Sequence, residues 1–218
     1  PKTNFANSIL ISGDASTGTL NAADGNTGVG IGVFGALTTG DNNVAVGLNA
    51  LDVNTTGSEN VAVGMGALDT NTTGAGNISI GCGSMSANVS GNYNVAIGRC
   101  ALDTSVSGSS NVAIGDRALY TNTASYNTSV GFFSLAANTT GETNVAVGQN
   151  SLAANTTGAR NTGIGQNALL VNTTGSNNTA VGQGALEANT TASDNAAFGH
   201  DSLVANTTGA GNAAYGYR

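Results

Sequence analysis

Charged residues are scarce in this 218-residue chain, and basic ones are the scarcest. They make up 8% of the sequence, with five Lys and Arg against twelve Asp and Glu, for a formal net charge of −7. Nucleic acids and anionic membranes are therefore poor partners, because both are bound through clusters of basic side chains. No stretch is apolar for long enough to span a bilayer, so the sequence also predicts no membrane insertion.

Cysteine, histidine and helical patterning are nearly absent as well. Two cysteines are too few to define a disulfide scaffold. His200 is the only histidine, and the sequence places no nucleophile beside it, so we expect neither an enzyme nor a bound cofactor. Glycine numbers 33 and recurs every few residues, while apolar heptads are missing, which excludes a long helix.

The chain contains a tandem repeat instead. A motif of Asn, a variable residue, a small residue, an apolar residue and Gly returns twelve times with a 17-residue period, except that one step is shorter by a single residue. A period near 20 is typical of a solenoid, in which stacked repeats bury a core that none could bury alone. We number the repeat positions from this Asn as position 1. The motifs begin at Asn26, Asn43, Asn60, Asn77, Asn94, Asn111, Asn127, Asn144, Asn161, Asn178, Asn195 and Asn212.

The motif predicts one short β-strand per repeat, because small and apolar residues alternate in it and β-branched residues are frequent. Position 1 is always Asn and position 5 always Gly, which predicts a ladder of stacked amides and a backbone with positive φ or too little room for a Cβ. Position 4 is always apolar, so we expect it to point into the core. The predicted ladders include Asn43, Asn60, Asn77, Gly47, Gly64 and Gly81.

The rest of each repeat predicts corners and turns. A small residue at position 8 precedes a large apolar one at position 9, and the repeat ends in Asn-Thr-Thr-Gly, which favours a turn. Each coil would hold a strand, a tight corner, a second extended or single-turn helical segment, and a turn. We therefore predict an all-β fold, a parallel β-solenoid or β-roll of about eleven 17-residue coils, at residues 26–218. Residues 1–25 form a lead-in or cap, and 111–126 is a short coil.

A coil this short has a thin interior, which bears on the oligomeric state. Only two large apolar side chains per repeat are available to offset the entropy lost in ordering the whole coil. We therefore expect several chains to share a core, with the small residues at position 3 letting strands of neighbouring chains approach closely. The alternative is a monomeric solenoid in which position 3 faces water.

These residues also carry a family resemblance. Asn-Val-Ala-Val-Gly at 43–47, 60–64 and 144–148, with the Ala-Leu and Asn-Thr-Thr-Gly that follow, resembles the repeats of phage and prophage tail fibres. The repeats are more distantly similar to the head repeats of trimeric autotransporter adhesins. The resemblance implies a homotrimeric structural fibre in a virion or on a cell surface. Its partners would be itself, other tail or surface-fibre proteins and host surface glycans, and its role would be host attachment.

Two alternatives to a phage tail fibre remain open. A bacterial surface adhesin or extracellular filament could be built from the same roll. An ice-binding solenoid is suggested by Thr ladders at positions 13 and 14, although adjacent residues in a turn do not make the flat Thr array that ice binding needs. The Asn-Thr-Thr triplets also match the N-glycosylation sequon, but the repeat itself generates them.

Three groups of residues are candidate sites. Asp52 and Asp69 share position 10 of adjacent coils and could hold a cation or act on a glycan, although a solvated face is the simpler interpretation. Cys82 and Cys100 lie in neighbouring coils and could form a disulfide. Aromatic residues gather at the short coil and could form a receptor or partner patch, or pack between chains. The members of this patch are Tyr120, Tyr126, Phe132 and Phe133.

Overall fold

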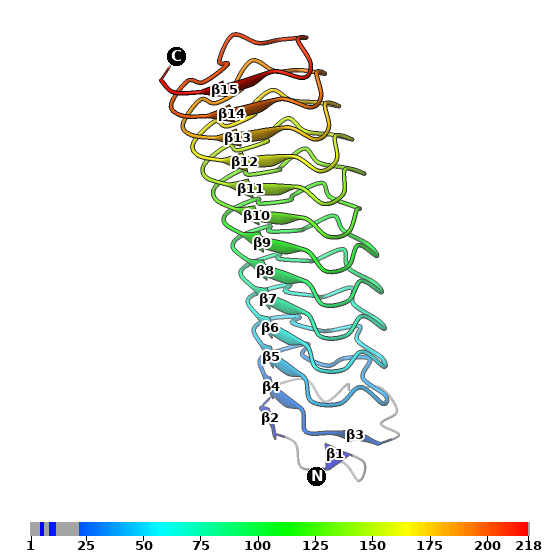
Figure 1. Cartoon of the computed structure of the whole chain (residues 1–218). Coiled ribbons are helices and arrows are strands. Elements are labelled where there is room, and N and C mark those ends of the chain that lie inside the picture. The colour runs from blue at the N-terminus through cyan, green and yellow to red at the C-terminus, as the bar shows by residue number, and fades with distance from the viewer. Residues whose placement is uncertain (1–4, 7–8, 12–21, 218) are drawn as a thin grey trace. The chain divides into compact units, whose positions relative to one another are not determined.

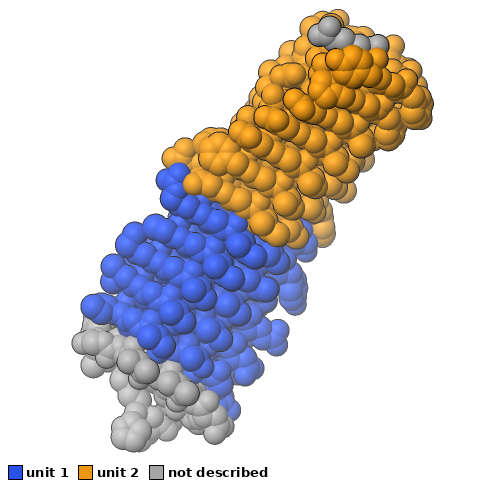
Figure 2. Space-filling model, turned by 90° about the vertical axis from the view of Figure 1, so that its left-hand side faces the viewer, with its two compact units in different colours: residues 1–110 blue, residues 111–218 orange. Residues whose placement is uncertain are grey.

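The computed structural model describes residues 5–6, 9–11 and 22–217. It is an all-β parallel β-solenoid of about eleven coils of about 17 residues, as predicted (Figure 1). The described residues contain no helix. The chain divides into two compact units, Pro1–Ser110 and Asn111–Arg218, which are described separately (Figure 2).

In the first unit one strand per coil stacks in parallel on the next. Residues one full repeat apart pair with each other, with Val44 opposite Val61 and Val61 opposite Ile78. The lead-in contributes three strands, since β1 pairs with β3 inside it and β2 pairs with β4 of the first coil. The strands are β1 Phe5–Ala6, β2 Ile9–Ile11, β3 Ala23–Asp24, β4 Thr27–Val29, β5 Val44–Val46, β6 Val61–Val63, β7 Ile78–Ile80 and β8 Val95–Ile97.

The second unit repeats this arrangement with one local exception. Thr128 in β10 lies opposite Val112 in β9, a step shorter than a full repeat by a single residue, whereas every later step is a full repeat. The strands are β9 Val112–Ile114, β10 Thr128–Val130, β11 Val145–Val147, β12 Thr162–Ile164, β13 Thr179–Val181, β14 Ala196–Phe198 and β15 Ala213–Tyr215. All of them fall on positions 2 to 4, so the predicted placement of the strands is confirmed.

The predicted orientation of the strands is wrong. The small residue at position 3 is fully buried, as at Ala45 and Ala146, while the apolar residue at position 4 lies outside, with Val46 36% and Ile80 37% exposed. The interior is narrow beside position 3, since even a Cβ added to Gly163 would lie too close, 2.6 Å, to the Ser151 hydroxyl oxygen. The core consists of the small residues of positions 3 and 8 together with the large apolar residue of position 9, which is buried from Leu51 through Met85 to Leu186.

The asparagines of position 1 form the predicted ladder inside each unit. The backbone N–H of Asn60 donates to Oδ1 of Asn43 at 2.9 Å, and Asn77 bonds to Asn60 in the same way at 3.0 Å. From Asn26 to Asn178, Nδ2 also donates to the carbonyl of position 15, as Asn43 does to Gly57 at 3.0 Å. The amide therefore satisfies buried backbone groups that no strand partner reaches, which explains why no other residue occupies position 1.

A second Asn ladder runs through position 12, the first residue of Asn-Thr-Thr-Gly. Nδ2 of Asn155 donates to Oδ1 of Asn138 at 2.7 Å and to the carbonyl of Gly158 at 2.9 Å. Sequence analysis assigned this Asn to a turn and missed its stacking. The signal was present, because position 12 is Asn in nine of the eleven coils. The Asn-Thr-Thr asparagines from Asn54 to Asn189 are buried, so in the folded chain they do not present an accessible amide to a glycosyltransferase.

Each coil turns through backbone with positive φ. The position 5 glycines have φ near +135°, as at Gly47 and Gly81, and a Cβ at either would lie 2.5 Å from a carbonyl oxygen of the next coil, so both predicted reasons for their invariance are confirmed. Positions 7, 9 and 17 are left-handed even without glycine, with Asn49, Leu51 and Glu59 at φ of 57°, 52° and 61°. The segment between the strands is thus a series of turns rather than a second strand or a helical turn.

Left-handed backbone at an exposed, β-branched residue is a testable source of strain. Thr143 is exposed at position 17 with φ of 60°. We expect Thr143→Gly to stabilise the protein by about 0.5–1 kcal/mol, because relief of the strain exceeds the entropy cost of glycine. Thr140 is also exposed but has negative φ, so Thr140→Gly is the control and should destabilise. Urea unfolding followed by circular dichroism measures both, and a loss of stability in Thr143→Gly would contradict the account.

The short coil lacks position 14 and keeps its hydrogen bonds. Ala124 takes the place of the position 15 glycine, and its carbonyl accepts from Nδ2 of Asn111 at 2.9 Å and of Asn122 at 2.8 Å. Thr123 keeps the link to the next coil through its N–H, which donates to the Thr139 carbonyl at 2.9 Å. The deletion thus removes an exposed turn residue. The position 1 ladder continues through it, and the position 12 ladder continues from Asn122 to Asn138.

Candidate functional site

The most prominent surface feature is the outward side of the strands, formed by positions 2 and 4. We call it the outward strand face. In the first unit it exposes Val29, Val46, Ile78 and Ile80 by 36–38% of their surface, and in the second Ile114 and Ile164 by 37% and 40%. No charged residue occurs at position 2 or 4 of any repeat. Thr occupies position 2 in four coils, and the other residues at both positions are apolar. A regular, uncharged and largely apolar surface is typical of a face that another molecule covers.

In the first unit the apolar surface extends past the strands to position 6. Ile31, Leu48 and Met65 occupy this position in successive coils and are 59%, 45% and 55% exposed. Their backbones are held in register, since the N–H of Asn49 donates to the Ile31 carbonyl at 2.8 Å and that of Gly66 to the Leu48 carbonyl at 2.9 Å. The strand face and this corner together make a broad apolar band on the first unit.

The predicted aromatic patch forms only in part. Phe132 and Phe133 are in contact, with ring centroids 4.5 Å apart, and the Arg117 guanidinium lies 5.3 Å from the Phe133 ring and 5.9 Å from the Tyr120 ring. Tyr126 does not join them, because it precedes strand β10 while Phe132 and Phe133 follow it. Sequence reasoning missed Arg117, although position 7 places it one coil before Phe133. The result is a cation held between two rings, with Phe132 48% exposed beside them.

The acidic residues at position 10 do not form a metal centre in the described part of the chain, where no three His, Cys, Asp or Glu side chains converge. Asp69 is half-buried, and its Oδ1 has no hydrogen-bond partner. Burial raises the pKa of Asp69 above its ordinary value of 3.8, and the Asp52 and Asp103 carboxylates raise it further, while backbone hydrogen bonds offset part of the rise. Ionisation of Asp69 therefore lowers the stability of the folded protein.

This shift predicts a pH dependence. The folded protein holds the Asp69 proton at a higher pH than the unfolded chain does, so stability rises as pH falls through the raised pKa and levels off below about 3.8. We expect Asp69→Asn to raise the melting temperature at pH 7 and to show a smaller advantage over wild type near pH 4. The exposed Glu59 provides the control, Glu59→Gln. An advantage for Asp69→Asn that is the same at both pH values would contradict the shift.

The two cysteines are close in the backbone. The N–H of Cys100 donates to the carbonyl of Cys82 at 3.0 Å, and the Cys100 sulfur lies 3.7 Å from where a Cβ on Gly83 would sit. Cys82 is exposed and Cys100 partly so. No bond joins the two sulfurs in the structure, and the disulfide stays a prediction.

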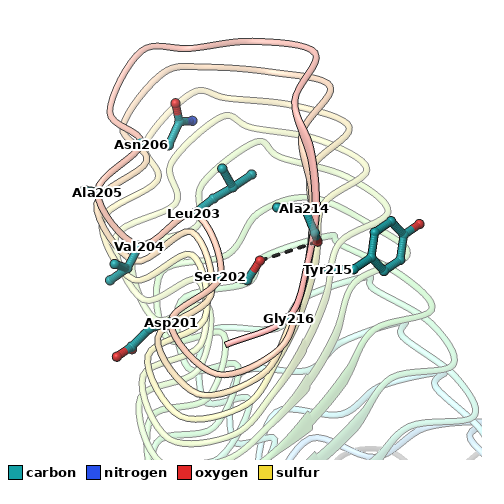
Figure 3. Close-up of a pocket in the computed structure, with 9 residues that line it drawn as sticks. All are labelled: Asp201, Ser202, Leu203, Val204, Ala205, Asn206, Ala214, Tyr215 and Gly216. Atoms are coloured by element: carbon teal, nitrogen blue, oxygen red, sulfur yellow. Dashed lines mark hydrogen bonds between the residues drawn. The ribbon is translucent and has the colours of Figure 1, made fainter. Parts of the chain in front are cut away.

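The last coil has a hollow that opens onto the solenoid interior. Figure 3 shows Ser202 and Leu203 on the inside of this coil, with the Ser202 hydroxyl donating to the Ala214 carbonyl at 3.4 Å, while Asp201 and Tyr215 point outward. One coil earlier, the equivalent Leu186 is fully buried. The hollow is therefore the end of the core rather than a shaped ligand pocket. His200 stacks on Tyr217 at 5.2 Å and lies 3.3 Å from the Asp201 carboxylate, without a nucleophile among its contacts.

The Thr ladders do not form a flat array. At position 13 the hydroxyl is engaged, since Thr55 donates to the Thr72 carbonyl at 2.9 Å and Thr156 to the Thr173 carbonyl at 3.0 Å. Position 14 is exposed, as at Thr56. Only one file of exposed hydroxyls remains, which does not favour ice binding.

Comparison with known proteins does not assign a function, so the function is argued from the surfaces described above. No family model, curated protein or solved structure matches the chain. Among the described residues, no helix has the length and apolar character needed to cross a membrane. The outward strand face and the corner at positions 6 and 7 are thus the surfaces on which a function must be argued.

Proposed function

We propose that this protein is a structural fibre, the shaft or distal part of a phage tail fibre that attaches to a host surface, and that it assembles as a homotrimer. The outward strand face carries the proposal. Its side chains repeat at the spacing of the coils, so an identical chain running parallel in register offers an apolar residue opposite each of them. The complete absence of charge at positions 2 and 4 favours burial against the same surface of another copy.

The residues proposed to meet between chains differ from those expected from the sequence. Position 3, expected at the interface, is inside each coil, so the chains would meet through positions 2 and 4. The three-fold symmetry itself comes from the resemblance to tail-fibre repeats and adhesin heads. The thin core of each coil, with one large side chain at position 9, is consistent with a fold that gains stability by association.

Light scattering tests the proposal through the mass of the particle. We expect about three times the chain mass of 21.1 kDa, and a band that resists detergent until it is boiled. Ile80→Lys places a charge on the outward strand face and should lower the mass, whereas the control Thr56→Lys, on the exposed turn, should leave it unchanged. A wild-type monomer would refute the assembly.

A bacterial surface adhesin or extracellular filament is the second candidate, because the outward strand face would serve it equally well. An adhesin needs an attachment to the cell, whereas a tail fibre is carried by the virion. Immunogold labelling distinguishes them, since label at the tips of virion tails supports the fibre and label on the surface of uninfected cells supports the adhesin.

A further inference from the structure

The corner that follows the strands differs between the two units. In the first unit position 6 is apolar from Ile31 to Met65. In the second, Phe132 is followed at the same position by three glutamines, and position 7 carries asparagines beside them. We call this set the amide strip. It consists of Phe132, Gln149, Gln166 and Gln183 at position 6 and Asn150 and Asn167 at position 7.

Backbone hydrogen bonds between coils keep the residues of the strip in register. The N–H of Asn150 donates to the Phe132 carbonyl, and that of Asn167 to the Gln149 carbonyl, both at 3.0 Å. Gly184 bonds to the Gln166 carbonyl in the same way at 3.0 Å. The position 6 side chains are therefore presented one per coil, at a spacing of about 4.8 Å.

The polar groups of the strip are available to a ligand. Gln149, Gln166 and Gln183 are exposed, and their amides have no hydrogen-bond partner in the described part of the chain. The neighbouring asparagines are pre-arranged, since Nδ2 of Asn150 lies 3.5 Å from Oδ1 of Asn167. Each amide offers two donors and an acceptor, and no charged residue occupies positions 6 and 7 from Phe132 to Gln183. A charge does lie beside these amides, the Glu187 carboxylate, to which Nδ2 of Asn167 donates at 3.4 Å, so that donor is already engaged.

Phe132 supplies a different contact at one end of the strip. Its ring is 48% exposed and rests against Phe133, which in turn lies over the Arg117 guanidinium. The ring is thus held by a tilted contact with Phe133 and is half-exposed, and an exposed aromatic ring can stack on the C–H face of a sugar. An aromatic platform followed by a file of uncharged amides fits a chain of hydroxyl-bearing rings better than it fits a charged or apolar partner.

We propose that the amide strip binds an extended, uncharged polysaccharide that runs along the coils. One sugar stacks on Phe132, and the hydroxyls of the following sugars bond to the glutamine amides, one coil after another. This inference rests on the proposed role in host attachment and gives it a surface and a ligand class. It does not depend on the oligomeric state, because the strip lies within one chain.

Affinity electrophoresis in native gels tests the inference with three uncharged polysaccharides, mannan, dextran and mixed-linkage β-glucan, and with the acidic polysaccharide alginate. The whole chain should be retarded by at least one of the uncharged three. The strip variant combines Gln149→Ala, Gln166→Ala and Gln183→Ala and should weaken retardation at least about tenfold, as loss of one or two hydrogen bonds per site would. Phe132→Ala should weaken it as well.

A matched control variant carries Thr140→Ala, Thr157→Ala and Thr174→Ala, three exposed residues at position 14 of the same unit. It should bind as wild type does. Retardation by none of the uncharged polysaccharides, retardation by alginate alone, or equal retardation of the strip and control variants would each overturn the inference. Light scattering on the same samples reports the fibre assembly separately, so failure of glycan binding and failure of the fibre are distinguishable.

Discussion

Gly64→Ala is expected to destabilise the protein by roughly 4 kcal/mol or more. Gly64 is at position 5 with φ of +139°, and a Cβ there would lie 2.5 Å from the carbonyl oxygen and 2.7 Å from the carbonyl carbon of Gly81 in the next coil. Both contacts are with backbone, so no side chain can move aside. The coils on either side would have to separate locally, which breaks the stack between β6 and β7.

A control for this substitution lies two residues away. Gly66 also has positive φ, +64°, but a Cβ there would meet only the Asp69 carboxylate at 3.8 Å. Gly66→Ala should therefore cost about 1 kcal/mol, the strain of left-handed alanine alone. Urea unfolding of both variants, with hydrogen exchange at the Val61–Val63 amides, measures the difference. Equal losses of stability in the two variants would show that the positive φ, and not the close approach of the next coil, requires glycine at position 5.

Asn144→Ala is expected to cost about 2–3 kcal/mol, because it leaves the buried N–H of Asn161 without a partner and removes one of the two donors to the Gly158 carbonyl. Oδ1 of Asn144 accepts from the N–H of Asn161 at 2.9 Å, and its Nδ2 donates to the Gly158 carbonyl at 2.9 Å. Alanine provides neither group. The Gly158 carbonyl keeps its hydrogen bond from Nδ2 of Asn155 at 2.9 Å, so the loss falls mainly on the Asn161 N–H. Thermal and urea unfolding give the loss, with exposed Gln149→Ala, expected within about 0.5 kcal/mol of wild type, as the control.

Asn144→Asp separates the two hydrogen bonds. It keeps an oxygen for the Asn161 N–H but loses the donor to Gly158 and buries a carboxyl group. Burial disfavours the charged form, so this variant should recover part of its stability, relative to wild type, as the pH is lowered. If Asn144→Ala and Asn144→Asp were both as stable as wild type at neutral pH, the ladder would be a consequence of the fold rather than a cause of it.

The sequence predicted the repeat, the strand positions and the Asn43 and Gly64 ladders because these depend on residues that never vary within the chain. The prediction of which side of the strand faces the core was wrong, because position 4 was expected inside and is outside, while position 3 is buried. Alternation shows that positions 3 and 4 face opposite ways, but not which way is inward. The answer depends on the width of the coil, which Leu152 on the far side nearly fills, leaving a Cβ on Gly163 only 3.4 Å from its Cδ1.

The candidate sites were predicted less well, since they depend on how coils stack. The sequence grouped Tyr126 with Phe132 by distance along the chain, yet the strand between them sends the two residues to different corners. Position numbering could have brought Arg117 and Phe133 together, because both are at position 7. Left-handed Leu51 had no signal at all, since leucine has no preference for that conformation and is held there by burial.

The most direct test of the account is a spin-label distance measurement on the outward strand face. Single labels are placed at Val63→Cys in the first unit or Val147→Cys in the second, in a background where Cys82 and Cys100 are replaced by serine. If parallel chains share this face in register, labels on different chains should lie close together, and equally close at both positions. No dipolar coupling between labels would contradict association through the strands, and closeness at only one position would contradict a parallel, in-register fibre.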